Sequence, residues 1–378
     1  MRILQLTKRA WPHRGGIERH VRDLATGLSA TGEATVEMVV AAGAPRSRTW
    51  FDGQVRIDEV AAFGRPWSLD LAPGYLGAVG RALDRAPDVV HLHEPHPLGL
   101  VTWAAMRHRM PPTVVTWHAD ITRQRLFLPV YGPLQRLLLR EAPAIIAQTD
   151  RHVSASAFLP AVASKCHVIP TGVDVARYLD VNAPMAGVTM RRAWGAPARV
   201  VLFVGRLIYY KGLPVLLDAM AGIDATLVLA GEGRDRGALE AQASRLGLAG
   251  RVRFLGDVPE SDLPALYHAC DLLVLPSTAI TEGFGLVQLE AMACAKPVVS
   301  TRLPTGVAVV NRDGVTGLTV PPGDVAALAK AISRLLDDRA FAAACGARAQ
   351  ARVLAEFSRD QMVADTLALY RAVARRPA

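Results

Sequence analysis

The sequence predicts an α/β protein built from two doubly wound parallel sheets. Its 378 residues amount to about twice a usual domain of ~150 residues. Short β-branched runs alternate with longer helical patterns in both halves, as in parallel sheets covered by helices. A stretch rich in Gly, Ala and Pro, 181–197, lacks clear periodicity and is expected to be a linker or a surface excursion.

The first half, 1–170, is expected to form one domain. Helices are predicted to begin near Glu18 and Tyr75, between strands of the sheet. The predicted strands are 2–6, 36–41, 88–92, 113–116, 144–148 and 167–170.

The second half, 171–357, is expected to form the other domain, with the boundary near Thr171. Ser261 and Asp324 are predicted helix N-caps. Apolar residues recur with helical spacing in 358–374, which predicts a closing helix that covers an apolar surface. The predicted strands are 200–204, 226–230, 252–255, 272–275, 298–300 and 317–320.

Composition excludes several classes of protein. No run of eighteen uncharged apolar residues occurs, and the N-terminus has the pattern of a buried strand, so we expect a cytoplasmic protein. The four cysteines are scattered without a C-x-x-C pair, which argues against disulfides and a thiolate zinc site. The net charge is +9, but aromatic and basic residues are not interleaved as in nucleic-acid-binding proteins, so no nucleic acid is expected.

The most informative motif is 276–292, a strand end that opens a helix. Gly283 and Gly285 let a ligand approach the main chain, and the helix N-terminus favours phosphate. Glu282 and Glu290 are expected to stand about 12 Å apart, the rise of eight helical residues, and to bind two diols of one elongated ligand. Alternatively, Glu290 is an ordinary helix residue and Glu282 a solvated charge; the glycines and the strand context favour the ligand site.

A second motif follows the strand 200–204. Arg206 and Lys211 stand five residues apart around a turn that begins at Gly205. Two such cations can neutralise a diphosphate leaving group. Surface cations on a strand-to-helix turn are the alternative, but ligands of open parallel sheets bind at the carboxyl ends of the strands.

The first half offers weaker strand-end motifs. Gly15 and Gly16 open a helix and could form a second phosphate-binding loop. His118 follows a strand, where a lone histidine is more often a hydrogen-bonded core residue than a catalyst. His13, Arg14, Asp120 and Arg123 are candidates for the acceptor side.

A competing hypothesis rests on the H-x-H-x-x-H pattern of His91, His93 and His96. This pattern is similar to a metal-hydrolase cluster, because His91 and His93 project from one face of a strand. The aspartate expected before His96 is absent, so we treat a metal-dependent hydrolase as the minority hypothesis and expect no metal.

The segment 123–140 mixes arginines with large apolar residues. It could lie at a membrane surface or pack as a basic amphipathic helix on its own domain. The basic first half, with 20 Lys and Arg against 14 Asp and Glu in residues 1–170, favours membrane contact, which would place the protein on the inner face of the plasma membrane.

Together these motifs resemble the family-four retaining glycosyltransferases, almost end to end and in order. The motifs that carry the resemblance are Gly15-Gly16-Ile17-Glu18, 169–174, 204–212, Gly231-Glu232-Gly233, Phe254-Leu255-Gly256 and Glu282 to Glu290. Within that family, Trp117-His118-Ala119-Asp120 and 300–306 look more like bacterial polysaccharide and O-antigen mannosyltransferases. Thr171 departs from the family's common asparagine, and Lys296 follows Ala295 where a glycine is common.

The resemblance implies a GT-B fold: two Rossmann-like domains facing each other across a cleft, the acceptor in the first and the donor in the second. It implies that 358–378 packs back on the first domain and that no metal or other cofactor is required. Arg206 and Lys211 would hold the diphosphate, Glu290 the ribose, and His118 would orient sugar hydroxyls. The remaining donor-side residues would be Gly15, Gly16, Gly205, Glu232, Val258, Glu282, Gly283, Phe284, Gly285 and Leu286.

The predicted function is therefore retaining transfer of a hexose from a nucleoside-diphosphate sugar to a glycan or lipid-linked glycan. GDP-mannose is the favoured donor, followed by UDP-hexoses. A sugar-nucleotide epimerase of the same fold would use the same donor site without an acceptor. A catalytically silent relative would have lost Arg206, Lys211, Glu282 or Glu290, and this chain keeps all four.

Overall fold

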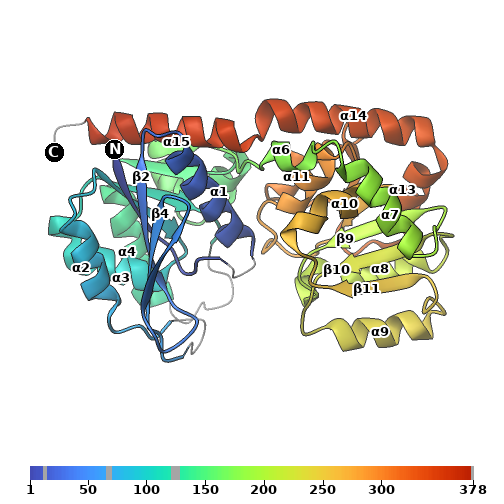
Figure 1. Cartoon of the computed structure of the whole chain (residues 1–378), viewed down its shortest axis with the longest axis horizontal. Coiled ribbons are helices and arrows are strands. Elements are labelled where there is room, and N and C mark those ends of the chain that lie inside the picture. Colours follow the sequence, from blue (N-terminus) through green and yellow to red (C-terminus); the bar gives the residue numbers. More distant parts are fainter. Residues whose placement is uncertain (12–14, 65–69, 121–127, 376–378) are drawn as a thin grey trace. The chain divides into compact units, whose positions relative to one another are not determined.

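The computed structural model describes residues 1–11, 15–64, 70–120 and 128–375. The chain divides into two compact units. Unit 1 comprises Met1–Gly172 and Arg359–Ala378, and unit 2 comprises Val173–Ser358. Each is an α/β unit built on one sheet (Figure 1).

The sheet of unit 1 has eight strands in the order β3-β4-β2-β1-β5-β6-β7-β8. All neighbours pair in parallel except β3, which is antiparallel to β4. The strands are β1 Arg2–Leu6, β2 Thr35–Ala41, β3 Arg48–Asp52, β4 Val55–Val60, β5 Val89–Glu94, β6 Thr113–Trp117, β7 Ala144–Ala147 and β8 Cys166–Val168.

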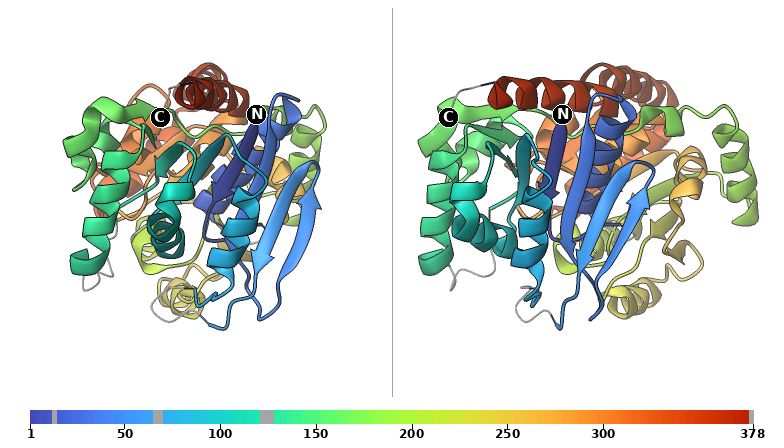
Figure 2. Two further views of the ribbon diagram at one scale, coloured as in Figure 1. Left: turned by 90° about the vertical axis from the view of Figure 1, so that its left-hand side faces the viewer. Right: turned by 60° about the vertical axis from the view of Figure 1, so that its left-hand side comes forward.

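Helices cover both faces of this sheet because its central strands are apolar on both sides. Along β1, Leu4 and Leu6 join one core cluster and Ile3 joins the other. Helices α2 Tyr75–Leu83, α3 Pro97–Met106 and α4 Leu128–Glu141 pack on the first cluster. Helices α1 Gly16–Ala30 and α15 Arg359–Ala374 pack on the second and contact each other (Figures 1 and 2). Shorter helices are η2 Arg107–Arg109, α5 Asp150–Ala155 and η4 Leu159–Lys165.

The sheet of unit 2 is fully parallel, with the order β11-β10-β9-β12-β13-β14. Val201 and Phe203 of β9 face one core cluster, and Val200 and Leu202 face the other. The strands are β9 Val200–Val204, β10 Thr226–Ala230, β11 Val252–Gly256, β12 Leu272–Leu275, β13 Val298–Thr301 and β14 Gly317–Val320.

The helices of unit 2 also form two layers. Helices α8 Leu213–Met220, α9 Arg236–Arg245 and α13 Val325–Asp337 cover one face, and α6 Val175–Tyr178, α10 Leu263–His268, α11 Leu286–Ala293 and α14 Arg339–Glu356 cover the other. The remaining helices are η5 Tyr209–Lys211, η6 Glu260–Asp262, α7 Ala183–Ala193 and α12 Val307–Val310.

Two local predictions were wrong. The expected linker at 181–197 contains helix α7, and Gly187 lets this helix pack closely, since a Cβ there would lie 2.7 Å from the Cβ of His268 on α10. Ser261 is not an N-cap, because it lies inside η6, and its hydroxyl contacts Asp262. The other predicted cap is confirmed: the Asp324 side chain accepts a hydrogen bond from the Ala327 backbone N–H at the start of α13.

The β3–β4 hairpin was not predicted from the sequence. Its outer strand is mostly exposed, and its only apolar residues are the adjacent pair Trp50 and Phe51. Cross-strand contacts hold it instead: Arg48 bonds Glu59 at 2.5 Å and Thr49 bonds Asp58 at 2.7 Å. Charged side chains on such an edge strand also discourage pairing with another chain.

Candidate active site

In unit 2, the loop after β9 places Arg206 and Lys211 at the carboxyl end of the sheet. Gly205 has φ +147° and Gly212 has φ +68°, conformations that other residues adopt only with strain. A Cβ on Gly212 would lie 2.0 Å from the Pro276 carbonyl oxygen. Glycine is therefore required where this loop meets the chain that leaves β12.

This close approach brings Lys211 to Glu282. The Lys211 Nζ lies 2.6 Å from Glu282 Oε2, and both residues are about nine-tenths buried, at 9% and 8% exposure. The Ser277 hydroxyl donates a second hydrogen bond to the same oxygen, at 2.9 Å. Two of the four predicted charged groups thus form one partly dehydrated ion pair, with Ser277 as a partner that the motif analysis had not singled out.

Arg206 differs from Lys211 in exposure. Its guanidinium is on the surface and donates to the Tyr210 hydroxyl at 3.3 Å. Because Tyr210 and Lys211 belong to the same 3-10 turn, Arg206 and Lys211 are held on one short loop. The loop therefore presents one exposed and one buried cation.

Glu290 is buried within α11, with 1% of its surface exposed. Its Oε2 accepts a hydrogen bond from the Tyr267 hydroxyl of α10 at 2.5 Å. Glu282 lies before the first turn, as expected, but α11 begins only at Leu286, so not all eight residues between Glu282 and Glu290 are helical. Glu290 is therefore in the second turn of the helix.

The remaining donor-side residues line the ends of neighbouring strands. Gly285, with φ +72°, is the N-cap of α11, and Leu286 is its first residue. The Gly283 carbonyl accepts from the Gly306 backbone N–H at 2.7 Å, and Phe284 packs edge-on to Phe357. Beyond β10 and β11, exposed Glu232 pairs with Arg236, and half-buried Val258 contacts the core.

In unit 1, Gly15 and Gly16 lie at the start of α1 as predicted. Gly15 is the N-cap, and a Cβ there would lie 2.1 Å from Glu18 Oε2. The Glu18 carboxylate therefore already lies against the backbone at the start of α1. His13, Arg14 and Arg123 lie outside the described residues.

His118, just after β6, belongs to a buried group of histidines. Its Nε2 lies 3.1 Å from His93 Nδ1, and the two rings are stacked. The ring of His20 from α1 lies edge-on to His118, with centroids 5.0 Å apart. Burial and the neighbouring imidazoles hold the pKa of His118 well below its usual value, so the ring is neutral.

The proposed ligand set of His91, His93 and His96 was wrong. His91 and His93 do share a strand face, with ring centroids 4.1 Å apart. His96, however, follows the strand and bonds the Tyr75 hydroxyl through Nε2 at 3.0 Å. His91 is bonded on both nitrogens, to Thr116 at 2.7 Å and to Tyr370 at 2.5 Å.

Asp120 stabilises the chain at the end of β6 through hydrogen bonds. Its carboxylate accepts hydrogen bonds from Trp117 Nε1, the Ser156 hydroxyl and the Ala157 backbone N–H, each at 2.7 Å. These bonds tie the end of β6 to the segment after α5. This role does not require an acceptor ligand.

The described part of the basic segment packs on unit 1. Tyr131, Leu138 and Leu139 of α4 are in the core, and the Tyr131 hydroxyl donates to Glu94 at 2.7 Å. These contacts match the alternative in which the helix covers its own domain. None of the helices in the described ranges combines the length and apolar character that a bilayer span demands.

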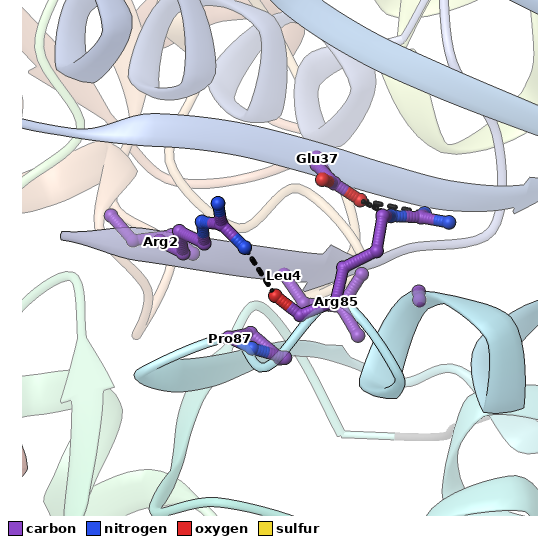
Figure 3. A pocket seen from close by; sticks show the side chains of 7 residues that line it. Arg2, Leu4, Glu37, Arg85 and Pro87 are labelled. Atoms are coloured by element: carbon purple, nitrogen blue, oxygen red, sulfur yellow. Dashed lines mark hydrogen bonds and ion pairs between the residues drawn. The ribbon is translucent and has the colours of Figure 1, made fainter.

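Figure 3 shows a small hollow in unit 1 at the start of β1, the amino end of this central strand. Arg2 reaches the Arg85 carbonyl at 2.6 Å, and Arg85 pairs with Glu37. This hollow contains none of the predicted site residues, and its polar groups satisfy one another.

Sequence reasoning missed the partners of the predicted groups. Ser277 stands two residues after the end of β12, so its position near a strand end was a usable signal. Tyr267 comes from α10, 23 residues before Glu290, and no local pattern links the two. The same is true of Thr171 and His20, which are 151 residues apart and bond at 3.1 Å.

Both halves of the chain match known families. Residues 14–177 match the family described as Glycosyltransferase Family 4, and residues 190–352 match Glycosyl transferases group 1. The chain is 30% identical over 375 residues to O-antigen chain mannosyltransferase C of Escherichia coli, covering 98% of both chains. It is 37% identical over 275 residues to the D-rhamnosyltransferase WbpZ of Pseudomonas aeruginosa, covering 72% of this chain and 70% of WbpZ.

A solved structure shows the same architecture. Alr3699/HepE of Anabaena, crystallised with UDP-glucose, superposes with a TM-score of 0.79 at 28% identity, covering 98% of this chain and 100% of HepE. The parallel sheets, the order of motifs and these matches agree with one another. The chain belongs to the group 1 glycosyltransferases, with a family 4 N-terminal half and a GT-B fold.

Proposed function

We propose that the protein transfers a hexose from a nucleoside-diphosphate sugar to a glycan or lipid-linked glycan acceptor during polysaccharide or O-antigen synthesis. The observation that carries the proposal is the Lys211–Glu282 pair, which lies with Arg206 where ligands of open parallel sheets bind. The relative named as an O-antigen chain mannosyltransferase supports the acceptor class.

In this proposal the diphosphate is held by the two cations of the β9 loop. Arg206 is exposed and can bind phosphate oxygens bidentately, while Lys211 supplies a point charge in a partly dehydrated setting. Charge that develops on the leaving diphosphate is then stabilised by side chains. We therefore expect transfer to need no metal and no other cofactor.

Glu282 and Glu290 would bind the two ends of the donor. Glu282 is fixed by Lys211 and Ser277, so its other oxygen can accept hydrogen bonds from sugar hydroxyls. Glu290, oriented by Tyr267, would accept the ribose hydroxyls. Gly283, Phe284 and Gly285 present main chain beside them, and His118 of unit 1 would orient the transferred sugar.

The reaction would retain the configuration of the sugar. The bond between the anomeric carbon and the diphosphate oxygen breaks as the acceptor oxygen bonds the same face of that carbon. The acceptor's proton passes to the departing diphosphate oxygen, so no protein nucleophile is needed. In this scheme neither Lys211 nor Glu282 acts as a nucleophile.

GDP-mannose is the favoured donor because a mannosyltransferase is similar to the chain over nearly its whole length. UDP-hexoses come next, since the HepE structure holds UDP-glucose. A thermal-shift screen against GDP-, UDP-, ADP- and TDP-sugars tests this order, because a bound ligand stabilises the folded state. Labelled donors that yield isomerised nucleotide sugar without any transfer would overturn the proposal in favour of an epimerase.

A further inference from the structure

Three histidines from separate parts of unit 1 converge at one point. His20 comes from α1, His93 from β5, and His118 from the residue after β6. One ring nitrogen from each lies within 4.8 Å of the others. All three are almost fully buried, at 3%, 2% and 5% exposure.

Two of these rings carry buried nitrogens without a partner. His20 Nε2 and His93 Nε2 are shielded from water and make no hydrogen bond. A buried polar atom left without a hydrogen-bond partner destabilises the folded state. His20 Nε2 belongs to the ring whose other nitrogen is already bonded to Thr171, so it is the nitrogen available to a ligand.

The spacing between two of the three rings suits a transition-metal ion. Two nitrogens bound at 2.0–2.1 Å to one tetrahedral zinc lie about 3.3 Å apart. His93 Nδ1 and His118 Nε2 lie 3.1 Å apart.

Neighbouring side chains orient one of the rings. His20 Nδ1 lies 3.1 Å from the Thr171 hydroxyl, and Gln148 donates to the same hydroxyl at 2.9 Å. Holding one nitrogen of an imidazole in this way leaves the other for a metal, as outer partners of metal-bound histidines do. Thr171 is the residue that departs from the asparagine common in the family.

We propose that His20, His93 and His118 form a trihistidine site for a zinc-like divalent transition-metal ion. Imidazole ligands suit zinc and its first-row neighbours, whereas magnesium prefers oxygen ligands. Among the described residues no carboxylate or thiol joins the group, which leaves a fourth position for water.

The site does not depend on the proposed function, although it shares His118 with it. Metal bound to His118 would withdraw that ring from sugar hydroxyls, so zinc is expected to inhibit transfer. This consequence rests on the proposed function, whereas metal binding does not. Binding is therefore tested on the protein alone.

The first experiment is calorimetric titration of the chelator-treated full chain with Zn²⁺ and with Mg²⁺. We expect one zinc site per chain and no magnesium binding. His93→Ala should abolish the zinc site, while His108→Ala, which removes an exposed histidine of η2, should leave it unchanged. Zinc binding by His93→Ala equal to that of the wild type, or its absence from the wild type, would overturn the proposal.

A second variant keeps all three ligands and so avoids a gap in the core. Thr171→Val removes the partner of His20, and we expect zinc affinity to fall by about 10- to 100-fold. In the wild type, Co²⁺ should give the strong visible absorption of tetrahedral coordination. Unchanged affinity in Thr171→Val, or a weak octahedral Co²⁺ spectrum, would contradict the site even if His93→Ala does not fold.

Discussion

The strand ends of the two units carry opposite kinds of chemistry on the same type of sheet. In unit 2, the loops after β9 and β12 bring a lysine and a glutamate to 2.6 Å, with a second cation exposed nearby. In unit 1, the ends of β5 and β6 gather neutral histidines away from solvent. A parallel sheet thus fixes where side chains meet, and local burial decides whether they meet as ions or as neutral groups.

This contrast has a physical origin. A charged pair that keeps about a tenth of its surface exposed retains some hydration and can exchange a partner for a ligand. Imidazoles with almost no exposure lose the hydration of their charged form, and their pKa values fall. Unit 2 is therefore suited to anionic ligands, and unit 1 to ligands that accept lone pairs from neutral imidazole nitrogens.

The largest expected effect comes from removing the cation of unit 2. We expect Lys211→Ala to weaken transition-state stabilisation by about 2–4 kcal/mol, or roughly 30- to 1,000-fold in kcat/KM, through loss of a charge-assisted contact. Steady-state transfer assays measure this effect. Lys330→Ala, on the exposed side of α13, is the matched control.

Turnover at the wild-type rate in a folded Lys211→Ala protein would show that Lys211 does not act in the site. The contrast between a charged site in unit 2 and a neutral one in unit 1 would then fail. Circular dichroism must accompany the assay, because the substitution leaves Glu282 buried without its counter-ion.

A somewhat smaller effect is expected from the backbone that positions the pair. Gly212→Ala should lower the free energy of unfolding by about 2–3 kcal/mol, because φ is +68° and the new Cβ would meet the Pro276 carbonyl. Gly222→Ala, where nothing lies within 4 Å, should change stability by less than about 0.5 kcal/mol. Chemical denaturation compares the two, and equal stabilities would show that the close approach of the two loops is not needed.

The smallest expected effect concerns the neutral histidines of unit 1. Burial, with the charge of Lys8 nearby, lowers the pKa of His96 from 6.5 to about 3. The unfolded chain therefore takes up this proton first as the pH falls, and the stability that the neutral ring confers is lost as the pH drops below 6.5. Between pH 7 and pH 5 this amounts to about 2 kcal/mol.

His96→Gln keeps a hydrogen-bonding side chain beside Tyr75 but cannot titrate. Its free energy of unfolding should therefore fall less than that of the wild type over the same interval. The other histidines contribute to both proteins and cancel in the difference. Parallel pH dependence of the two proteins would mean that folding does not change the pKa of His96.

The sequence predicted much of the fold because both sheets consist of apolar runs between helical patterns. The strands at 2–6, 200–204 and 226–230 were predicted with the bounds that the structure shows. The β3–β4 hairpin was missed because β3 is mostly exposed and mixes polar and aromatic residues. Helix α7 was missed because its buried face consists of small residues, Ala183 and Gly187.

The candidate site was predicted only in part, for a similar reason. The residue types at strand ends were visible, so Lys211, Glu282 and Glu290 could be named. Tyr267, the partner of Glu290, could not be named, because it comes from a distant segment. The histidine group likewise combines His20 with two strand-end residues that are far from it in sequence, and no spacing rule connects them.

Hydrogen–deuterium exchange with added GDP-mannose or UDP-glucose tests most directly whether unit 2 holds the donor. The account predicts slower exchange in 204–212 and 277–290, and loss of this protection in Lys211→Ala. Protection confined to unit 1, in a protein that still transfers sugar, would contradict it.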